Sequence, residues 1–445
     1  MRRAARIQSA IELIDDVEAS LATRGVAADR LIDVYFRSRR YAGAGDRREI
    51  IRLVYGVIRH RGLLIWSLDL KDGQRPSGRQ LVLAFLAAVE HETDATITND
   101  FSGGRFAPAP LSASERRLMD RLSHEDSMAN APLWARYNVP EWLVAPLEES
   151  LGERLNEELE ALGGRASVDL RVNSLKADRN GVQVDLAKAG IETEACPFSP
   201  VGLRLTGTGR VTDLPSYRDG LFEIQDEAAQ VASLLAEPER GMTVVDLCAG
   251  AGGKALALAA RMGNSGTIHA YDVDRARLEE LDRRARRAGV TIAYARTLPD
   301  GADRAKVLDD IAGRADRVVL DVPCSGTGTW RRNPEGRWRL TPDLLDANCE
   351  RQKALLKEGA VLVKPGGRLI YMTCSILKRE NADNADNFLT ANPAFRAVDY
   401  RAVWQKAIGP EPAESASGEA PYLTLTPARH GTDGFFVAVF ERKIP

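Results

Sequence analysis

Two cysteines in this 445-residue sequence follow short apolar runs. Cys324 lies in the segment D-V-P-C-S-G at residues 321–326, and Cys374 lies in Y-M-T-C-S at residues 371–375. If both runs are parallel strands, their carboxyl ends meet at the edge where open α/β sheets bind ligands. A thiolate at such an edge is a candidate nucleophile, whereas a lone cysteine there would more often be an inert buried thiol. Because two cysteines share this setting, we interpret both as reactive residues rather than as residues that only fill the core.

A glycine-rich turn precedes both cysteines at residues 245–254, which read V-D-L-C-A-G-A-G-G-K. Glycines let the backbone turn sharply, and the helix start that follows offers free N–H groups to a ligand. Asp272 ends the next apolar run, where an acid can bond ribose hydroxyls. The pattern favours an adenosine-containing cofactor over a tight turn without a ligand. A nucleoside triphosphate is disfavoured, because Ala255 rather than serine or threonine follows Lys254.

The elements that must position these residues alternate from Gly241 onward. We expect strands at 243–247, 267–271, 291–295, 317–320 and 368–372, with helices at 253–262, 274–287 and 341–362. This alternation implies a parallel sheet covered on both faces, to which residues 434–439 would add an antiparallel edge strand. Two shorter strands at 168–172 and 202–205, around a helix at 180–189, predict a small α/β module.

The first part of the chain has helical apolar spacing, with helices expected near 8–23, 27–38, 80–91 and 113–123 and a loop over 93–114. A chain of 48.7 kDa exceeds the usual size of one hydrophobic core. We therefore expect an all-α domain at 1–135, the small α/β module at 136–235 and a catalytic domain at 236–445.

Charge is unevenly distributed along the chain. The formal net charge is −2, but residues 1–64 hold 13 arginines against 8 acidic residues. A local basic segment predicts contact with a polyanion such as RNA, and a solvated arginine face is the alternative. Arg37, Arg39, Arg40, Arg47 and Arg48 are the candidates for phosphate contacts.

Two classes of protein are disfavoured by composition. The sequence has no apolar run long enough to span a membrane and no signal-peptide pattern, so we expect a cytoplasmic protein without membrane contact. Its five cysteines include no C-x-x-C pair, which disfavours a disulfide framework and a structural zinc site. No metal is expected.

Together, these motifs resemble those of the RNA cytosine-5 methyltransferases of the Fmu/Sun (NOL1/NOP2/Sun, RsmB-like) family. The similarity covers residues 140–445, through R-V-N at 171–173, I-Q-D-E at 224–227, the turn at 248–254, D-V-P-C-S-G-T-G-T at 321–329, T-C-S at 373–375 and D-G-F-F at 433–436. The N-terminal part, with D-R-R at 46–48 and V-Y-G-V-I-R at 54–59, is similar to the NusB-like domain of the bacterial small-subunit rRNA member.

The resemblance implies an α/β protein with a class I (Rossmann-like) methyltransferase sheet, a small α/β RNA-binding module and an all-α N-terminal domain. It implies S-adenosyl-L-methionine as the cofactor and RNA as the partner, with small-subunit (16S) rRNA as the substrate of a monomeric enzyme. The target cytosine would have to leave its stack to reach the thiols.

The resemblance also implies a role for each site residue. Cys374 would add to C6 of cytosine, Cys324 would assist product release, and Asp321 would hold or protonate the ring near N3. The cofactor contacts would be Cys248, Ala249, Gly250, Ala251, Gly252, Gly253, Lys254, Asp272 and Asp321. DNA cytosine-5 methyltransferases use a P-C cysteine instead, so Cys324 is the alternative nucleophile.

This sequence departs from the family pattern at three places. Ala251 replaces the usual proline of the turn, and Ala255 replaces the usual threonine. The family places an aspartate after the third strand to meet the adenine; here Thr297 or Leu298 stands there, and Asp300 follows in the loop. The missing acid motivates a second hypothesis, a non-catalytic rRNA-binding assembly factor that retains the fold. A dinucleotide-dependent oxidoreductase is a third.

Overall fold

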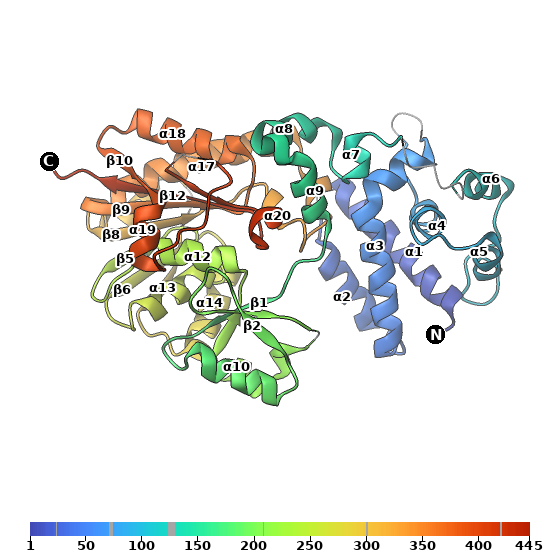
Figure 1. The fold of residues 1–445 in the computed structure, drawn as a ribbon, viewed down its shortest axis with the longest axis horizontal. Helices are drawn as coiled ribbons and strands as arrows, with labels where there is room; N and C mark the ends of the chain where they lie inside the picture. The colour runs from blue at the N-terminus through green and yellow to red at the C-terminus, as the bar shows by residue number, and fades with distance from the viewer. Residues whose placement is uncertain (24, 71–73, 123–129, 208, 300, 419–420) are drawn as a thin grey trace. The chain divides into compact units, whose positions relative to one another are not determined.

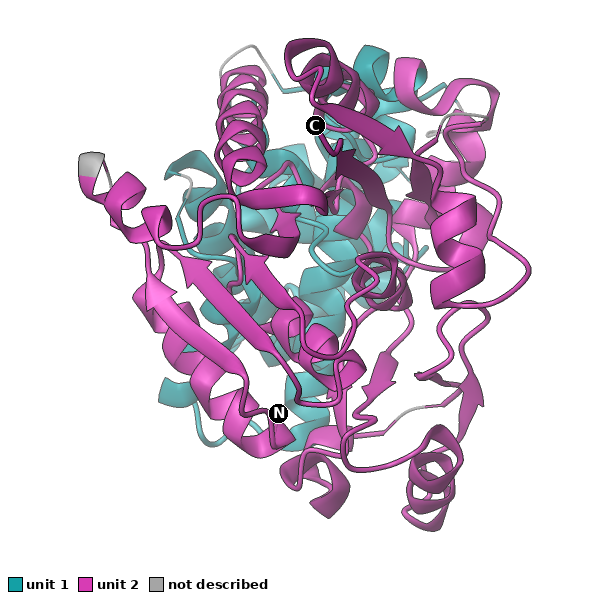
Figure 2. Cartoon of the chain, turned by 90° about the vertical axis from the view of Figure 1, so that its left-hand side faces the viewer, with its two compact units in different colours: residues 1–148, 332–341 teal, residues 149–331, 342–445 magenta. Residues whose placement is uncertain are grey.

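The structure is a computed structural model that describes residues 1–445 except 24, 71–73, 123–129, 208, 300, 419 and 420. The chain forms two compact units, residues 1–148 with 332–341 and residues 149–331 with 342–445 (Figure 2). Residues 332–341 thus belong to the first unit, although they follow the Cys324 segment in the chain. The predicted domain limits at residues 135 and 235 stay predictions.

The secondary-structure elements of the first unit, within the described residues, are helices, as the apolar spacing predicts (Figure 1). The helices are α1 (Arg3–Thr23), α2 (Ala28–Ser38), α3 (Ala44–Leu68), α4 (Gly78–Ala88), α5 (Asp94–Asp100), α6 (Ala113–Leu122), α7 (Leu133–Arg136), the 3-10 turn η2 (Glu141–Leu143), α8 (Val144–Leu151), which extends past residue 148, and α16 (Gly336–Arg339). The prediction of a loop over 93–114 is wrong at α5. Thr93 is the N-cap of this helix and accepts a hydrogen bond from the Thr96 N–H. The polar composition of the segment favoured a loop, so the helix was not predicted.

The 332–341 segment makes buried polar contacts within the helical unit. Arg337 is 1% exposed and donates to the backbone carbonyls of Tyr137 and Asn138, at 3.2 and 3.0 Å. Glu335 accepts a hydrogen bond from the Ala28 N–H at the start of α2, at 3.2 Å. Because a helix start has unpaired N–H groups, Glu335 satisfies one of them from a distant part of the chain.

The second unit begins with a four-stranded antiparallel sheet in the order β2-β3-β1-β4. Its elements are η3 (Gly152–Arg154), α9 (Leu155–Gly163), β1 (Asp169–Val172), α10 (Arg179–Lys188), β2 (Thr193–Ala195), β3 (Gly202–Leu205), η4 (Val211–Asp213), α11 (Pro215–Arg218) and β4 (Phe222–Ile224). Leu170, Leu203 and Phe222 on the strands share a buried cluster with Val182 and Leu186 of α10. The two strands and the helix predicted here are present as β1, β3 and α10.

A larger sheet follows, in the order β10-β12-β9-β8-β5-β6-β7, with β11 paired to β12. Its elements are α12 (Glu227–Leu235), β5 (Thr243–Asp246), α13 (Gly253–Arg261), β6 (Thr267–Asp272), α14 (Arg275–Ala288), β7 (Ala293–Thr297), α15 (Ala302–Asp309), β8 (Ala315–Asp321), η5 (Thr327–Thr329), α17 (Pro342–Leu362), β9 (Val363–Thr373), η6 (Lys378–Glu380), α18 (Ala382–Ala391), β10 (Phe395–Val398), α19 (Tyr400–Ala407), β11 (Leu423–Leu425), α20 (Pro427–His430) and β12 (Phe435–Arg442).

Strands β9, β8, β5, β6 and β7 are parallel, whereas β12 is antiparallel to its neighbours, and helices cover both faces (Figure 1). Helices α12, α13, α14 and α19 share one buried cluster with the sheet, and α15, α17 and α18 share the other. The predicted β12 strand is antiparallel, but its predicted place at the sheet edge is wrong. β12 lies between β9 and β10, because its backbone pairs with β9 along one edge and with β10 and β11 along the other.

The strand order reverses between β5 and β8. From β5 the chain moves outward through β6 and β7, then returns to place β8 and β9 on the other side of β5. Ligands of open α/β sheets bind outside the carboxyl ends of the strands at such a switch point. The glycine-rich turn follows β5 and the Cys324 segment follows β8, so both lie there. In the described part of the chain, no helix has the length and apolar character to cross a membrane.

Candidate active site

The two cysteines lie side by side because β8 and β9 end together. Asp321, the last residue of β8, pairs with Met372 of β9. The Sγ atoms of Cys324 and Cys374 are 3.4 Å apart. The hydrogen bond between the two thiols and burial raise the pKa of Cys324 well above its ordinary value. The structure therefore brings together the two thiols that the sequence singled out.

The segment that contains Gly434 packs against the two cysteine segments through Gly328. The Gly328 N–H donates to the Cys374 carbonyl at 2.9 Å, and the Gly434 N–H donates to the Gly328 carbonyl at 2.9 Å. A Cβ atom on Gly328 would lie only 2.1 Å from the Gly434 carbonyl oxygen. This close approach explains why glycine stands both in the Cys324 segment and in the D-G-F-F motif.

The glycine-rich turn adopts the conformation that its composition predicts. Gly252 precedes α13 with φ of 82°, and a Cβ atom there would lie 2.6 Å from Cγ of Leu281. The Asp272 carboxylate accepts hydrogen bonds from the N–H groups of Gly250 and Asp274, at 2.7 and 2.8 Å. Asp272 therefore holds the turn directly, beside any contact that it makes with a ligand.

Two arginines hold the turn from outside. Arg171 of β1 donates to the Gly253 carbonyl, and Arg284 of α14 donates to the Ala251 carbonyl, both at 2.7 Å. Glu223 of β4 accepts hydrogen bonds from Arg284 and from Arg287. Burial lowers the pKa of Arg171 to about 10. The small sheet thus supports the turn through β1 and β4.

Negative charge gathers at the ends of β5, β6 and β8. Asp246, Asp272 and Asp321 end these strands, and Lys254 of α13 contacts Asp321 at 2.6 Å. Asp246 is fully buried, and neither of its side-chain oxygens has a hydrogen-bond partner among the described residues. Burial, with the nearby charge of Asp321, raises the pKa of Asp246 to about 7. This group of side chains suits a cationic ligand better than a phosphate.

The remaining predicted cofactor positions lie in the glycine-rich turn and after β7. Cys248 and Ala249 lie in the turn, and burial, with the charge of Asp246, raises the pKa of the Cys248 thiol. At the adenine-side position, Thr297 is exposed and pairs with Asp272, whereas Leu298 is buried. Asp300 lies outside the described residues. The two described residues therefore bring no acid to this position.

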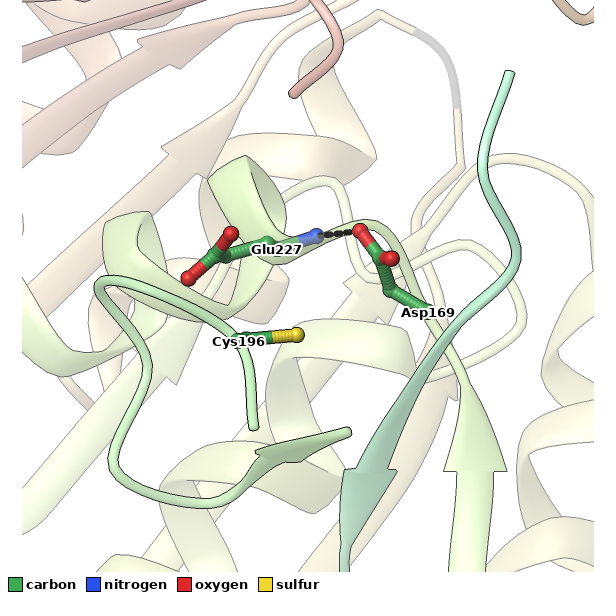
Figure 3. Close-up of side chains that lie close together, drawn as sticks. All are labelled: Asp169, Cys196 and Glu227. Atoms are coloured by element: carbon green, nitrogen blue, oxygen red, sulfur yellow. Dashed lines mark hydrogen bonds between the residues drawn. The ribbon is translucent and has the colours of Figure 1, made fainter. Parts of the chain in front are cut away.

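A separate acidic cluster contains Asp169, Cys196 and Glu227 (Figure 3). Arg204 contacts the Asp169 and Glu227 carboxylates at 2.7 and 3.3 Å, and Glu227 also accepts from the Ser199 N–H. Because Arg204 already supplies the positive charge, these residues form a buried ion-pair network. A metal ion would have to displace Arg204.

Comparison with known proteins identifies the family. A profile described as 16S rRNA methyltransferase RsmB/F matches residues 233–441, and one for its ferredoxin-like domain matches residues 139–212. The probable ribosomal RNA small subunit methyltransferase B of Synechocystis is 32% identical over 98% of this chain and 99% of its own length. The chain belongs to the RsmB/F family of methyltransferases.

Solved structures share the fold of this RsmB/F family member. The crystal structure of PH0851 superposes with a TM-score of 0.78 at 28% identity, covering 99% of each chain. NSun6 from Pyrococcus horikoshii, solved with SFG, shares the fold at a TM-score of 0.60 and 20% identity over 69% of this chain and 98% of its own. The predicted Rossmann-like methyltransferase fold is confirmed.

The cofactor of this RsmB/F family member is S-adenosyl-L-methionine, as its methyltransferase family implies. The residues present fit it, since the cofactor carries a sulfonium and an ammonium group and the strand ends carry carboxylates. Buried Asp246, with two unpartnered oxygens, is the clearest sign of a missing cationic partner. Sequence reasoning gave no role to Asp246 or Arg284, and it noted Arg171 only as part of the R-V-N motif. A charged residue at the end of an otherwise apolar strand was the available signal for Asp246.

Titration of Asp246 should affect stability. Its pKa rises from 3.8 to about 7 on folding, so the folded protein holds a proton that the unfolded chain releases between these pH values. The contribution is fully present below pH of about 4 and is lost as the pH rises through about 7. We expect Asp246→Asn to be more stable than the wild type at pH 8, by on the order of a few kcal/mol, and this difference to shrink toward pH 4.

Urea denaturation across this pH range, without added cofactor, measures the effect. Asp282→Asn removes the same charge from an exposed position and serves as the control. A difference between Asp246→Asn and the wild type that is constant with pH would contradict the prediction.

Proposed function

We propose that the protein methylates C5 of a cytosine in small-subunit (16S) rRNA through a covalent bond between a cysteine and C6. The observation that carries the proposal is the pair of thiols 3.4 Å apart at the ends of β8 and β9. The relatives named ribosomal RNA small subunit methyltransferase B support an rRNA substrate. Cytosine C5 becomes nucleophilic only after a nucleophile adds to C6, and a thiolate suits that addition.

In this mechanism, Cys374 is the nucleophile. Its sulfur forms a bond to C6, and the electrons of the C5=C6 double bond move into the ring toward N3. Asp321 acts here in its carboxylic acid form, which donates a hydrogen bond or its proton to N3 as negative charge develops there. The Cys324 thiol can donate a hydrogen bond to the Cys374 sulfur, since the two Sγ atoms are 3.4 Å apart.

Release requires the reverse bond change. After C5 has taken the methyl group, Cys324 takes the C5 proton while its own thiol proton passes to the departing Cys374 sulfur, so that the C5=C6 double bond forms again and the sulfur–C6 bond breaks. Cys324 lies next to the sulfur that must depart, and we assign it to this step. Bound S-adenosyl-L-methionine supplies the methyl group on its sulfonium. Residues 248–254, Asp272 and Asp321 would hold it, with Lys254 keeping Asp321 in place through their ion pair.

RNA binding by the helical unit is part of the proposal, but its arginines are not equivalent. Arg39 pairs with Glu12 and lies 3.7 Å from the ring centre of Tyr35. Arg47 donates to the Ala42 carbonyl. The side chains of Arg37, Arg40 and Arg48 are exposed, and we assign the phosphate contacts to them.

The product identifies the reaction. We expect the purified protein to transfer label from methyl-labelled S-adenosyl-L-methionine to 16S rRNA, and nuclease digestion to place it in 5-methylcytidine. Label in another nucleoside would contradict C5 chemistry. Binding to 16S rRNA without any methyl transfer would favour an assembly factor, the alternative that Thr297 motivates.

Substitution separates the roles of the thiols. We expect Cys374→Ala to lower methyl transfer by at least about 1,000-fold and to form no covalent complex. Cys324→Ala should methylate once and remain bonded to RNA, because the thioether persists without removal of the C5 proton. Denaturing gels with radiolabelled RNA reveal the complex. Cys349→Ala, which removes a buried thiol of α17, is the control. A complex with Cys374→Ala and none with Cys324→Ala would reverse the roles.

The salt dependence of RNA affinity tests whether arginines of the helical unit contact RNA phosphates. We expect reversal of Arg37, Arg40 and Arg48 to glutamate to weaken RNA binding and to reduce the slope of log affinity against log salt by about three. Filter binding over a range of salt concentrations measures the slope. Reversal of the exposed Arg314, Arg351 and Lys357 controls for net charge. An equal change in both triple variants would contradict a local contact.

A further inference from the structure

A buried polar pair follows the Cys374 segment directly in the chain. Glu380 ends η6 with 0% exposure, and Asn381 follows it with 4% exposure. Among the described residues, no lysine or arginine forms a salt bridge with Glu380. A buried carboxylate without a cation is costly unless hydrogen bonds compensate it, so its partners indicate what it does.

Glu380 contacts the peptide group after Cys324 directly and the one before it through Gln352. Its Oε1 accepts from the Ser325 N–H at 2.8 Å and from Gln352 Nε2 at 2.9 Å. Gln352 also donates to the Pro323 carbonyl at 3.0 Å. The Glu380 Oε2 accepts from the Ser325 hydroxyl. Glu380 and Gln352 therefore hold the chain immediately before and immediately after the thiol.

The orientation of Gln352 is set by its other contacts. Its Oε1 accepts a hydrogen bond from Asn384 Nδ2 at 2.8 Å. A flipped amide would place its nitrogen against this donor and its oxygen against the Pro323 carbonyl and the Glu380 carboxylate. Gln352 is thus a specified donor to Glu380 and to the Cys324 segment.

Asn381 makes the corresponding contacts around Cys374. Its Oδ1 accepts from the Thr373 hydroxyl at 2.6 Å, and its Nδ2 donates to the Ser375 carbonyl at 2.9 Å. The hydroxyls of Ser325 and Ser375 are 3.1 Å apart, which joins the two segments directly. Consecutive residues therefore hold the chain on both sides of both thiols.

We propose that Glu380 and Asn381 are positioning residues that set the separation and orientation of the Cys324 and Cys374 thiols. Neither residue contacts a reacting atom in this proposal. It rests on the proposed function, in which both thiols act on one cytosine within a few ångströms. The charge of Glu380 adds a second effect, since it contributes to the raised pKa of Cys324.

The pair of thiols can be probed without RNA. A trivalent organoarsenical, phenylarsine oxide, bonds two adjacent thiols through one arsenic atom and releases water from its oxygen and the two thiol protons. We expect it to take two of the five free thiols of the wild-type protein, counted by titration after denaturation. Cys324→Ala and Cys374→Ala should not form this bridge.

The positioning variants are Glu380→Ala and Asn381→Ala. We expect each to lower the single-turnover methylation rate by about 100-fold at saturating cofactor and RNA, and to slow bridging by the arsenical at least about tenfold. The dissociation constant for S-adenosyl-L-methionine should stay within about threefold, because these residues do not contact the turn. Thermal unfolding of each variant verifies that it folds.

Glu380→Gln separates hydrogen bonding from charge. Its amide oxygen can accept from the Ser325 N–H and its amide nitrogen can donate to the Ser325 hydroxyl, so the methylation rate should recover to within about threefold of the wild type. Loss of the negative charge should also shift the pH profile of bridging to lower pH. If Glu380→Ala does not fold, Glu380→Gln and Asn381→Ala still test the positioning role through their methylation and bridging rates.

Glu158→Ala is the matched control. Glu158 is buried and accepts from the Thr426 hydroxyl and the Ala428 N–H, the same two kinds of donor, away from the cysteines. The proposal would be overturned if Glu380→Ala and Asn381→Ala were bridged by the arsenical at the wild-type rate. It would also be overturned if Glu158→Ala lowered the bridging rate as much as they do. Methylation at an atom other than C5, with the same order of bridging rates, would overturn the proposed function and leave the positioning role intact.

Discussion

The pairing register of β8 with β9 is the constraint on which the rest of the site depends. Parallel strands that end opposite each other, at Asp321 and Met372, release their chains at the same level of the sheet. Two loops of similar length then suffice to bring the thiols together. A slip of one residue would exchange the two faces of the strand, placing buried Tyr371 on the wrong side and separating the cysteines. Apolar packing on both faces of β9 therefore sets a distance between two sulfur atoms.

The glycine-rich turn depends on a different kind of constraint, the pairing of buried charges. Arg171 and Arg284 donate to carbonyls that would otherwise face apolar surroundings, and Glu223 balances the arginines. Arg171 and Glu223 come from the small sheet, so that sheet contributes to the shape of the cofactor turn as well as to any RNA contact. On the ligand side the balance is left open, with carboxylates in excess around Lys254. Charges on the outer side of the turn are therefore balanced between the arginines and Glu223. The excess carboxylates on its inner side can pair with a cationic ligand.

Sequence reasoning located the residues whose local pattern is strong. The alternation of strands and helices, the glycine-rich turn and the two cysteine motifs each occupy a few consecutive positions, so they were predictable. It failed where the cause is distant in the chain. The internal place of β12 depends on β10, the pairing of Arg39 depends on Glu12, and the hold on Cys324 depends on Gln352 and Glu380. Hydrogen bonds between polar residues 27 to 55 positions apart leave no periodic signal.

The assignment of residues 332–341 to the helical unit has a consequence for biosynthesis. A ribosome that has completed residues 1–148 has made most of that unit but not Glu335, Arg337 or the rest of α16. The start of α2 and the carbonyls near Asn138 then lack their native partners while nearly 200 further residues are translated. The native contacts of the helical unit are therefore complete only after the strand that leads to Cys324 has been translated. Completion of the two units is thereby coupled in time.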